Sequence, residues 1–320
     1  MREPFFSIVI PTFQRRESVC AALTALAGLR YRGKFEVVVV VDGSTDGTAA
    51  ALRGLSFPFP LHIVEQPNRG QASARNRGAS EASGEIILFL DDDMIAQPDL
   101  LEHHARSLEE GADAVTGEIW VDPGSPPGFV TDALVRAAEW ERKPPLTGFD
   151  VYSGHMSIAK TVFDEVGGFD ESLLAEGYGT EDLDFGLRLV AGHDVRHNKA
   201  AVAWQRSLVG PREHMRRARK LAKADVRAIA KHPDIISRLL ECRGAPRPGE
   251  SSLTLKLSRL PLLPEIAAAI ATVSAELAPK LGLGSNRALV RIYFGARSMA
   301  YWSALRRAGG ATRLREWLGQ

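Results

Sequence analysis

The chain has 320 residues, of which 45% are hydrophobic and 25% charged, a composition typical of a globular protein with one large domain or two smaller ones. Two cysteines are too few for a disulfide framework, which excludes the disulfide-rich secreted class and favours a reducing compartment. Residues 210–320 carry 21 Lys and Arg against 8 Asp and Glu, whereas residues 1–209 carry 19 against 31. We therefore expect an acidic domain over residues 1–209 and a basic region over residues 210–320.

Two features favour a cytoplasmic protein. The apolar run Phe5–Ile10 follows Glu3 and Pro4 and has no cleavage site after it, so it does not resemble a signal peptide. The longest membrane-like stretch, Ile266–Ala275, is well short of the roughly 20 residues that a spanning helix needs.

Buried strands alternate with helices through the first third of the chain. Apolar or β-branched runs predict strands over Phe6–Ile10, Phe35–Val41, Leu61–Glu65 and Ile86–Leu90. Helical spacing and capping residues predict helices over Arg16–Leu29, from Asp46 to Leu52, over Gly70–Glu81 and over Asp99–Glu110. This order predicts an α/β fold with a doubly wound, mainly parallel sheet flanked by helices.

The first strand-to-helix turn excludes a dinucleotide-binding version of this sheet. A dinucleotide site needs a glycine-rich turn, so that the backbone can approach a pyrophosphate. The turn Pro11–Glu17 contains no glycine.

Three carboxylates, Asp91, Asp92 and Asp93, follow the fourth strand directly. Neighbouring carboxylates repel one another, and a divalent cation such as Mg²⁺ or Mn²⁺ removes that repulsion. Ligands of open α/β sheets bind beyond the carboxyl ends of the strands, where this triplet lies. The alternative is an acidic turn that caps the following helix.

Two further residues belong to the same sheet edge. Asp42 ends the second strand and suits a hydrogen bond to a ribose or a base, although a turn-forming role is as well supported. Arg75, in the helix before the fourth strand, can meet a phosphate as a charged fork, or lie on a solvated helix face.

The next segments favour an acceptor site. Asp113–Val121 and Tyr152–Ala159 read as strands, separated by a loop rich in Pro and Gly with a short helix over Thr131–Trp140. Such loops often line a site or move over it. Trp140 and Phe149 suit either stacking on a sugar or local packing.

A helix beginning at Glu181 and Asp182 carries the second acidic group. Carboxylates in a first helical turn suit the helix dipole, which is the structural interpretation. The functional interpretation is that one of them takes a proton from an acceptor hydroxyl.

Four motifs in this order resemble those of family 2 glycosyltransferases with the GT-A fold. They are Ser7–Phe13, Val41–Thr48, Asn68–Gly78 and Leu88–Asp93, and the sequence around Gly167–Asp170 and Glu181–Arg188 adds a fifth resemblance. The resemblance covers roughly the first 200 residues and implies an inverting transfer of a sugar from a nucleotide-sugar donor to a hydroxyl acceptor, which is a glycan, a lipid-linked molecule or another alcohol.

The resemblance also assigns roles by position. It implies that Pro11, Phe13, Asp42 and Arg75 line the nucleoside pocket, that Asp91–Asp93 is the D-x-D motif, with Asp92 on the donor side, and that Asp93 binds the metal. Asp91 assists the metal or faces the ribose, and Asp182 is the base, with Glu181 as its neighbour. We place Gly154, His155 and Trp140 on the acceptor side.

One departure from the family concerns a histidine. Many relatives carry a His after the next strand that helps to hold the metal or the diphosphate, but here the strand Ala200–Trp204 ends in Gln205. His214 and His155 are candidates to replace it. This departure leaves a catalytically silent binding partner as an alternative to an enzyme, and a nucleotidyltransferase is a third class.

The basic region contains two amphipathic helices, predicted over Met215–Lys231 and Ala288–Arg307. They either pack on the catalytic domain or dock on an anionic membrane surface, which would place the protein on the inner face of the membrane. No nucleic-acid-binding motif accompanies the charge, so we expect no nucleic-acid partner.

Overall fold

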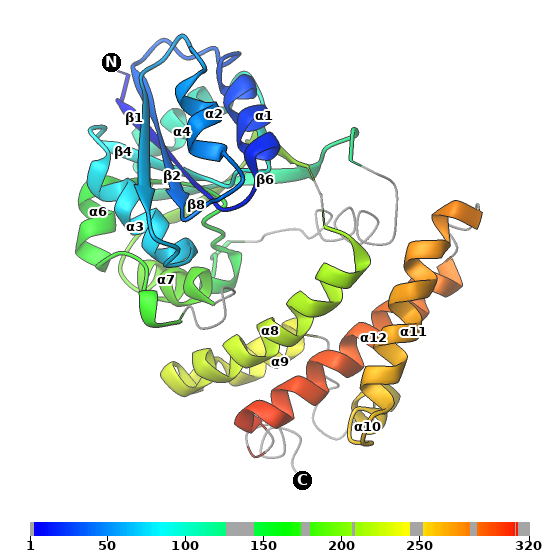
Figure 1. The fold of residues 1–320 in the computed structure, drawn as a ribbon. Helices are drawn as coiled ribbons and strands as arrows, with labels where there is room; N and C mark the ends of the chain where they lie inside the picture. Colours follow the sequence, from blue (N-terminus) through cyan, green and yellow to red (C-terminus); the bar gives the residue numbers. More distant parts are fainter. Residues whose placement is uncertain are drawn as a thin grey trace. The chain divides into compact units, whose positions relative to one another are not determined.

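The computed structural model describes residues 3–125, 144–173, 180–206, 209–243, 252–281, 287–310 and 312. The chain forms two compact units, each with its own hydrophobic core (Figure 1). The first unit comprises residues 1–124, 138–174 and 181–207, and the second comprises residues 125–137, 175–180 and 208–320.

Within the described residues, the first unit is built on an eight-stranded sheet in the order β3-β2-β1-β4-β7-β6-β8-β5. The strands are β1 (Phe6–Thr12), β2 (Phe35–Asp42), β3 (Leu61–Gln66), β4 (Ile86–Leu90), β5 (Met94–Ala96), β6 (Ala114–Val121), β7 (His155–Ala159) and β8 (Val195–Gln205). Strands β1 to β4 are mutually parallel, β7 inserts antiparallel between β4 and β6, and β5 is antiparallel to β8. The predicted α/β fold with a mainly parallel sheet is confirmed.

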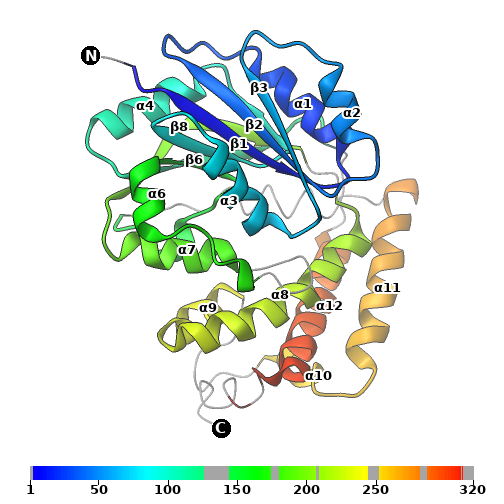
Figure 2. The same ribbon diagram turned by 60° about the vertical axis from the view of Figure 1, so that its left-hand side comes forward.

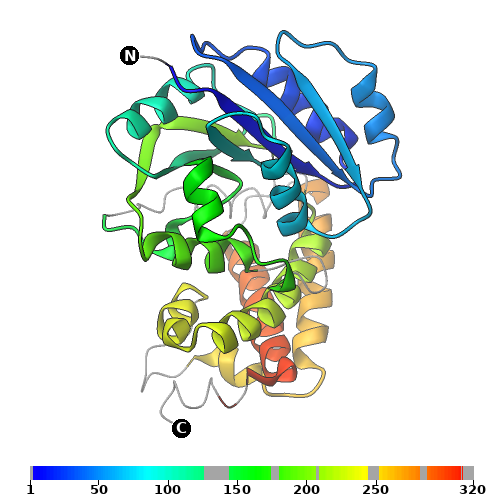
Figure 3. The same cartoon turned by 90° about the vertical axis from the view of Figure 1, so that its left-hand side faces the viewer.

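Helices cover both faces of this sheet (Figures 2 and 3). One face carries α1 (Arg16–Leu26), α2 (Thr48–Arg53) and α4 (Leu100–Glu109), and the other carries α3 (Gln71–Glu81), α6 (Lys160–Val166) and α7 (Glu181–Val190). Alternate side chains of one strand serve the two cores: Ile8 and Ile10 pack with the first group, and Val9 packs with the second. Strands buried on both faces explain the continuous apolar runs in the sequence.

Three strands differ from the sequence prediction, and one of them is β7, which begins at His155 instead of Tyr152. The sequence did not predict β5, because three residues do not establish a periodicity. β8 begins at Val195 instead of Ala200, since its first residues are polar and pair with β6 through their backbone. Its register on β6 shifts between Gly117 and Glu118, where Gly117 faces Asn198 but Glu118 faces Val202. This β-bulge is a feature that sequence periodicity does not reveal.

The second unit is helical. It contains α8 (Pro211–Lys231), α9 (Ile236–Cys242), α10 (Leu253–Leu257), α11 (Leu263–Leu277) and α12 (Arg287–Leu305). Helix α12 packs against both α8 and α11, with Tyr293 and Trp302 buried along it. The two predicted helices are present as α8 and α12, and the predicted C-terminal helical extension is confirmed. Among the described residues, no helix combines the length and apolarity needed to cross a bilayer.

Candidate active site

The acidic triplet forms the turn between β4 and β5. The Asp91 N–H donates to the Gly154 carbonyl at 3.0 Å, and the Met94 N–H donates to the Asp91 carbonyl at 3.1 Å. Because β1, β2 and β4 are parallel, Thr12, Asp42 and the triplet lie at the same edge of the sheet. This is the edge at which open α/β sheets bind their ligands.

Arg15, in the loop after β1, holds two of the three carboxylates. Its Nη1 lies 2.8 Å from Asp92 Oδ1 and 3.1 Å from Asp93 Oδ2. The Thr12 hydroxyl donates to the second oxygen of Asp92 at 2.7 Å. Burial raises the pKa of Asp92, and Arg15 opposes that shift. Both oxygens of Asp92 are engaged, so this residue anchors the turn, and the donor-side role expected for it stays a prediction.

Asp93 is the carboxylate of the triplet with an open oxygen. Its Oδ1 is buried and has no hydrogen-bond partner among the described residues. Burial and the charge of Asp91 raise its pKa to about 6. A buried oxygen without a partner costs about 1–3 kcal/mol, and a hard cation is a ligand that removes this cost. The chemistry of Asp93 therefore fits a divalent metal.

No group of three potential metal-binding side chains is present in the part of the chain that the structure describes. Asp91 has both oxygens engaged, because Arg75 Nη2 lies 2.8 Å from Oδ1 and the Tyr152 hydroxyl donates to Oδ2 at 2.8 Å. A cation at this edge would therefore need ligands from a substrate and from water, as Mg²⁺ commonly has.

Arg75 is the hub of a second charge cluster. It is 1% exposed, and its Nη1 lies 3.2 Å from Glu181 Oε1 and 3.5 Å from Asp182 Oδ1. With Asp91 on Nη2, one guanidinium contacts three carboxylates from two different elements. The sequence predicted that Arg75 reaches this edge as a phosphate ligand, whereas the structure shows it bound to carboxylates. The phosphate role itself stays a prediction.

The two acidic residues that begin α7 occupy unlike environments. Glu181 is 3% exposed, and its Oε2 has no hydrogen-bond partner among the described residues. Burial, together with the charge of Asp182, raises the pKa of Glu181 to about 7. The Asp182 side chain keeps 26% of its surface exposed and accepts a hydrogen bond from the Ser153 hydroxyl. Burial raises the pKa of Asp182, and Arg75 opposes that shift. Of the pair, Asp182 is the one that an acceptor can reach.

Asp42, at the end of β2, is tied to the start of α3. It accepts hydrogen bonds from the N–H groups of Arg69 and Gly70, each at 2.8 Å, and from the Gln66 side chain at 2.8 Å. Asp42 therefore shapes the loop that leads to Arg75. At the end of β1, Pro11 is buried, whereas Phe13 is 47% exposed.

Gly154 belongs to the site. A Cβ at this position would lie 2.5 Å from Asp91 Oδ2 and 2.4 Å from the Tyr152 ring, so only glycine permits the contact between these two side chains. His155 points elsewhere: it is 1% exposed, and its Nε2 lies 3.1 Å from Nε2 of His104 on α4. The predicted acceptor-side position of the His155 side chain is therefore not supported, because strand alternation turns it into the core.

The remaining candidates are placed as follows. Trp140 lies outside the described residues. Gln205 ends β8, and His214 belongs to the second unit, where its Nδ1 lies 3.1 Å from the Tyr293 hydroxyl and burial lowers its pKa to about 4. His155 contacts the core, and His214 contacts Tyr293. Neither residue therefore gains support as a replacement for the metal- or diphosphate-binding histidine of the relatives.

Sequence reasoning missed Arg15, Tyr152 and Ser153. Arg15 lies two residues after the motif Ser7–Phe13, but its partners are about 77 residues away in the chain. The signal that could have found it is the excess of carboxylates at the edge, which requires buried cations nearby.

Comparison with known proteins identifies the family. The family model "Glycosyl transferase family 2" matches residues 7–163. The chain carries a family 2 glycosyltransferase domain. This family 2 domain is similar to validoxylamine A glucosyltransferase of Streptomyces hygroscopicus subsp. limoneus, with 31% identity over 268 residues, 74% of this chain and 58% of that protein. It is also similar to glycosyltransferase AglE of Haloferax volcanii, with 29% identity over 60% of this chain and 66% of that protein. The chain thus spans about three fifths of the curated relatives it matches.

Solved structures of glycosyltransferases share the fold. The mannosyltransferase PcManGT of Pyrobaculum calidifontis, in complex with GDP-Man and Mn²⁺, superposes with a TM-score of 0.57 at 22% identity, over 99% of this chain and 88% of that chain. S. aureus TarS 1-349 in complex with UDP superposes with a TM-score of 0.54 at 21% identity, over 97% and 92%. These likenesses confirm the GT-A fold of the family 2 domain.

Proposed function

We propose that the domain transfers a sugar from a nucleotide-sugar donor to an acceptor hydroxyl, with inversion at the anomeric carbon and with help from Mg²⁺ or Mn²⁺. The observation that carries this proposal is the presence of two unlike carboxylates at one sheet edge. Asp93 has a buried oxygen without a partner among the described residues, and Asp182 has a partly exposed side chain held by Ser153. The first suits a cation and the second suits proton transfer.

Asp93 would hold the divalent cation, and since both oxygens of Asp91 are engaged, the remaining ligands would come from the substrate and from water. When bound, the cation neutralises the charge that develops on the leaving diphosphate. The complex of the P. calidifontis mannosyltransferase with Mn²⁺ supports the use of a divalent cation. Arg15 keeps Asp93 in place through its second oxygen and balances part of the acidic charge while the site is open.

Pro11, Phe13 and Asp42 would line the nucleoside side of the donor site. The exposed Phe13 ring offers a face for a base, and Asp42 fixes the loop opposite it. The solved relatives bind GDP-Man in one case and UDP or UDP-GlcNAc in another, which supports a nucleotide-sugar donor. Arg75 fixes the positions of Asp91 and Asp182 relative to the donor.

Asp182 takes the proton of the acceptor hydroxyl as that oxygen attacks the anomeric carbon. The new carbon–oxygen bond forms on one face, the bond to the diphosphate oxygen breaks on the other, and the nucleoside diphosphate leaves with the electron pair. A single displacement therefore inverts the anomeric centre. Since burial raises its pKa, Asp182 accepts a proton more readily than an exposed aspartate would.

The test is Asp182→Asn. We expect turnover to fall about 10²–10⁴-fold, the usual contribution of a positioned base, while donor affinity stays within twofold or so. Donor affinity is measured by calorimetry with Mn²⁺ and a panel of nucleotide sugars, and product configuration by NMR. Unchanged turnover in this variant would refute the assignment of the base, and a retained anomeric configuration would refute the single displacement.

Two other classes predict different products. A nucleotidyltransferase would release pyrophosphate instead of a nucleoside diphosphate, and a catalytically silent relative would bind the donor and release neither. The silent class is favoured by Gln205 at the end of β8, where relatives carry the histidine. Analysis of the released nucleotide in the presence of Mn²⁺ separates the three classes.

The proposed setting is glycan synthesis, such as that of a surface polysaccharide or a glycolipid, by a cytoplasmic protein at the inner face of a membrane. The basic helix α8 is a weaker membrane contact than its sequence suggests. Several of its arginines are paired: Arg212 with Glu276 at 2.8 Å, Arg219 with Glu265 at 2.7 Å, and Arg216 with Glu213.

Helix α11 presents a better surface for lipid. It buries small residues such as Ala268, Ala271 and Ala275 and exposes its large aliphatic ones, the reverse of a water-facing helix. The exposed residues of the helix recur every three or four positions and so form one stripe, which comprises Ile266, Ile270, Val273 and Leu277. Leu262 and Leu281, just beyond the two ends of α11, are also exposed. The net positive charge of residues 210–320 complements anionic lipid, at about 1 kcal/mol for each basic residue near the surface.

Vesicle flotation tests this surface. The full chain should float with vesicles of phosphatidylcholine and phosphatidylglycerol at low salt, and Ile266→Asp with Ile270→Asp should abolish flotation. Leu55→Asp, at an exposed aliphatic residue of the first unit, is the control that should still float. If the unaltered chain, the double variant and the control all float equally, or if none of them floats, the membrane role is contradicted. If the chain instead forms a concentration-dependent dimer that the double variant abolishes, the stripe is assigned to self-association.

A further inference from the structure

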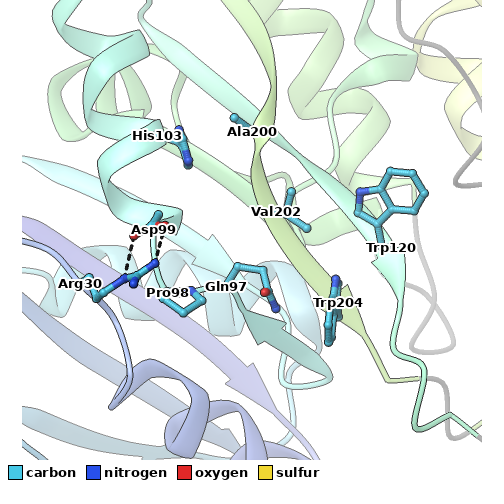
Figure 4. A pocket seen from close by; sticks show the side chains of 9 residues that line it. All are labelled: Arg30, Gln97, Pro98, Asp99, His103, Trp120, Ala200, Val202 and Trp204. Atoms are coloured by element: carbon cyan, nitrogen blue, oxygen red, sulfur yellow. Dashed lines mark hydrogen bonds and ion pairs between the residues drawn. The ribbon is translucent and has the colours of Figure 1, made fainter.

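The first unit contains a second hollow, separate from the acidic edge. It has a volume of about 440 Å³ and is lined by Arg30, Gln97, Pro98, Asp99, His103, Trp120, Ala200, Val202 and Trp204 (Figure 4). These residues come from the loop after α1, the segment joining β5 to α4, helix α4 itself, and the strands β6 and β8. None of them belongs to the donor, metal or base positions described above.

Two indole rings form one wall of this hollow. Trp120 and Trp204 are register partners on the neighbouring parallel strands β6 and β8, so their side chains leave the same face of the sheet. Trp120 is 49% exposed, and Trp204 is partly exposed. Single exposed aromatic residues are common on protein surfaces, but two neighbouring ones on one sheet face offer a larger apolar surface to a ligand ring.

The β-bulge creates this pairing. Asn198 faces Gly117 and Val202 faces Glu118, so the residues between them extend β8 without a partner on β6. The extra residues bring Trp204 opposite Trp120, and Ala200, within the bulge, lines the hollow. Bulges commonly re-aim side chains beside binding sites.

The other wall is polar. Arg30 and Asp99 form a two-point ion pair, with distances of 3.0 and 2.8 Å, and the side chains of Gln97 and His103 lie beside it (Figure 4). Their charges cancel, and residues 1–209 are acidic overall, which disfavours a nucleic acid or another polyanion. An aromatic wall facing planar hydrogen-bonding groups suits a neutral ring that has apolar C–H faces and hydroxyl edges.

The hollow is also joined to the acidic edge by one strand pair. Strand β5 starts directly after Asp93 and ends directly before Gln97. Each residue of a strand advances roughly 3.3 Å, so the four steps from Asp93 to Gln97 span at most about 13 Å. The Arg206 N–H donates to the Asp93 carbonyl at 2.8 Å, and the Gln97 N–H donates to the Val202 carbonyl at 3.1 Å. Both ends of this short connection are therefore fixed by β8.

We propose that this hollow is a second saccharide-binding site, in which a sugar unit of the acceptor or product glycan stacks on Trp120 and Trp204. The polar wall of Arg30, Asp99, Gln97 and His103 binds its hydroxyl groups. The proposal rests on the glycan-transfer function proposed above, but the binding it describes requires neither the donor nor the cation.

Fluorine NMR of the full chain, labelled with fluorotryptophan, tests the binding directly. Trp120→Phe and Trp204→Phe assign the two signals among the five tryptophans. Maltotriose, cellotriose, mannotriose and chitotriose are added in turn without donor or metal. We expect at least one trisaccharide to shift the signals of both Trp120 and Trp204 and to leave the signal of the buried Trp302 in place. A panel in which neither signal moves, or in which all tryptophans move together, overturns the proposal.

Variants give the second readout. Trp120→Ala should weaken the binding of the active trisaccharide roughly tenfold, the size of one lost stacking contact, and Leu55→Ala should leave it unchanged. Donor affinity should be the same in both. If the signals shift but no nucleotide sugar is ever turned over, the proposed transfer fails and the saccharide site stands. If transfer occurs and Trp120→Ala binds the trisaccharide as the unaltered chain does, the saccharide site fails alone.

Discussion

At the scale of single residues, the acidic edge is organised by two arginines that share five carboxylates. Arg15 contacts Asp92 and Asp93, and Arg75 contacts Asp91, Glu181 and Asp182. Two positive charges do not balance five negative ones, so the edge retains an acidic excess that a cation would reduce. Burial is the main reason why the pKa values of Asp93 and Glu181 are raised, and the neighbouring charges of Asp91 and Asp182 add to it.

Glu181→Gln should change how stability depends on pH. Because the folded chain raises the pKa of Glu181 to about 7, its protonated form favours folding, and this contribution is lost as pH rises from about 4.5 to 7. We expect the variant to be about 1–3 kcal/mol more stable than the unaltered chain at pH 8, and similar to it near pH 4. Urea unfolding across this range measures the difference.

The control for that experiment is Glu17→Gln on the exposed surface of α1, which should leave the pH profile unchanged. Parallel profiles for Glu181→Gln and the unaltered chain would show that Glu181 is ionised at little cost in the folded state.

Gly154→Ala tests the packing of the site. The added methyl would overlap Asp91 Oδ2 and the Tyr152 ring, so it should destabilise the chain by about 1–3 kcal/mol and displace Asp91. Gly192→Ala, where nothing lies within 4 Å of the new methyl, is the matched control. The urea midpoints of the two variants are compared; equal midpoints would mean that the turn after β4 relaxes freely.

At the scale of elements, the order from β1 to β4 could be predicted because buried parallel strands are continuous apolar runs. The strand β7 was also predicted, but its antiparallel direction was not, since strand direction depends on partners distant in sequence. The short β5 was missed because three residues do not establish a periodicity. The same holds for the site: Asp93 and Asp182 follow from motifs, whereas the ion pairs of Arg15 and Arg75 arise only when separate elements meet. The direction of the His155 side chain could not be predicted, because alternation within β7 depends on where that strand begins, and its acceptor-side role stays a prediction.

Asn76→Ala tests how α3 holds the loop before α7. The Phe169 N–H donates to Asn76 Oδ1 at 2.9 Å, and Asn76 Nδ2 donates to the Phe169 carbonyl at 2.9 Å. Removing this side chain leaves two backbone groups without their partner and should cost about 2 kcal/mol. Arg77→Ala, on the exposed side of the same helix, should cost less than about 0.5 kcal/mol. Thermal unfolding of both variants measures the loss of stability. Equal losses in Asn76→Ala and Arg77→Ala would contradict a special role for Asn76.

At the scale of the whole molecule, the charge differs between an acidic N-terminal part, residues 1–209, and a basic C-terminal part, residues 210–320. Residues 1–209 hold 31 of the 39 acidic residues, and residues 210–320 hold 21 of the 40 basic ones. The acidic excess suits a metal-bound donor, and the basic excess together with the α11 stripe suits an anionic surface. The two properties are tested separately, because vesicle binding should not require the donor.

Binding of cation and nucleotide together should stabilise the first unit. A ligand present at a hundred times its Kd stabilises the folded state by about 2.7 kcal/mol, whereas a ligand with no site gives no shift. We expect Mn²⁺ with UDP or GDP to raise the unfolding temperature by several degrees, and Mn²⁺ alone to raise it less, since Asp93 supplies few of the ligands by itself.

Asp93→Asn should abolish the joint shift without lowering the basal unfolding temperature, because the oxygen it replaces has no hydrogen-bond partner among the described residues. Asp99→Asn, at the saccharide hollow, should keep the full shift. A joint shift that survives in Asp93→Asn would show that the nucleotide binds without this carboxylate.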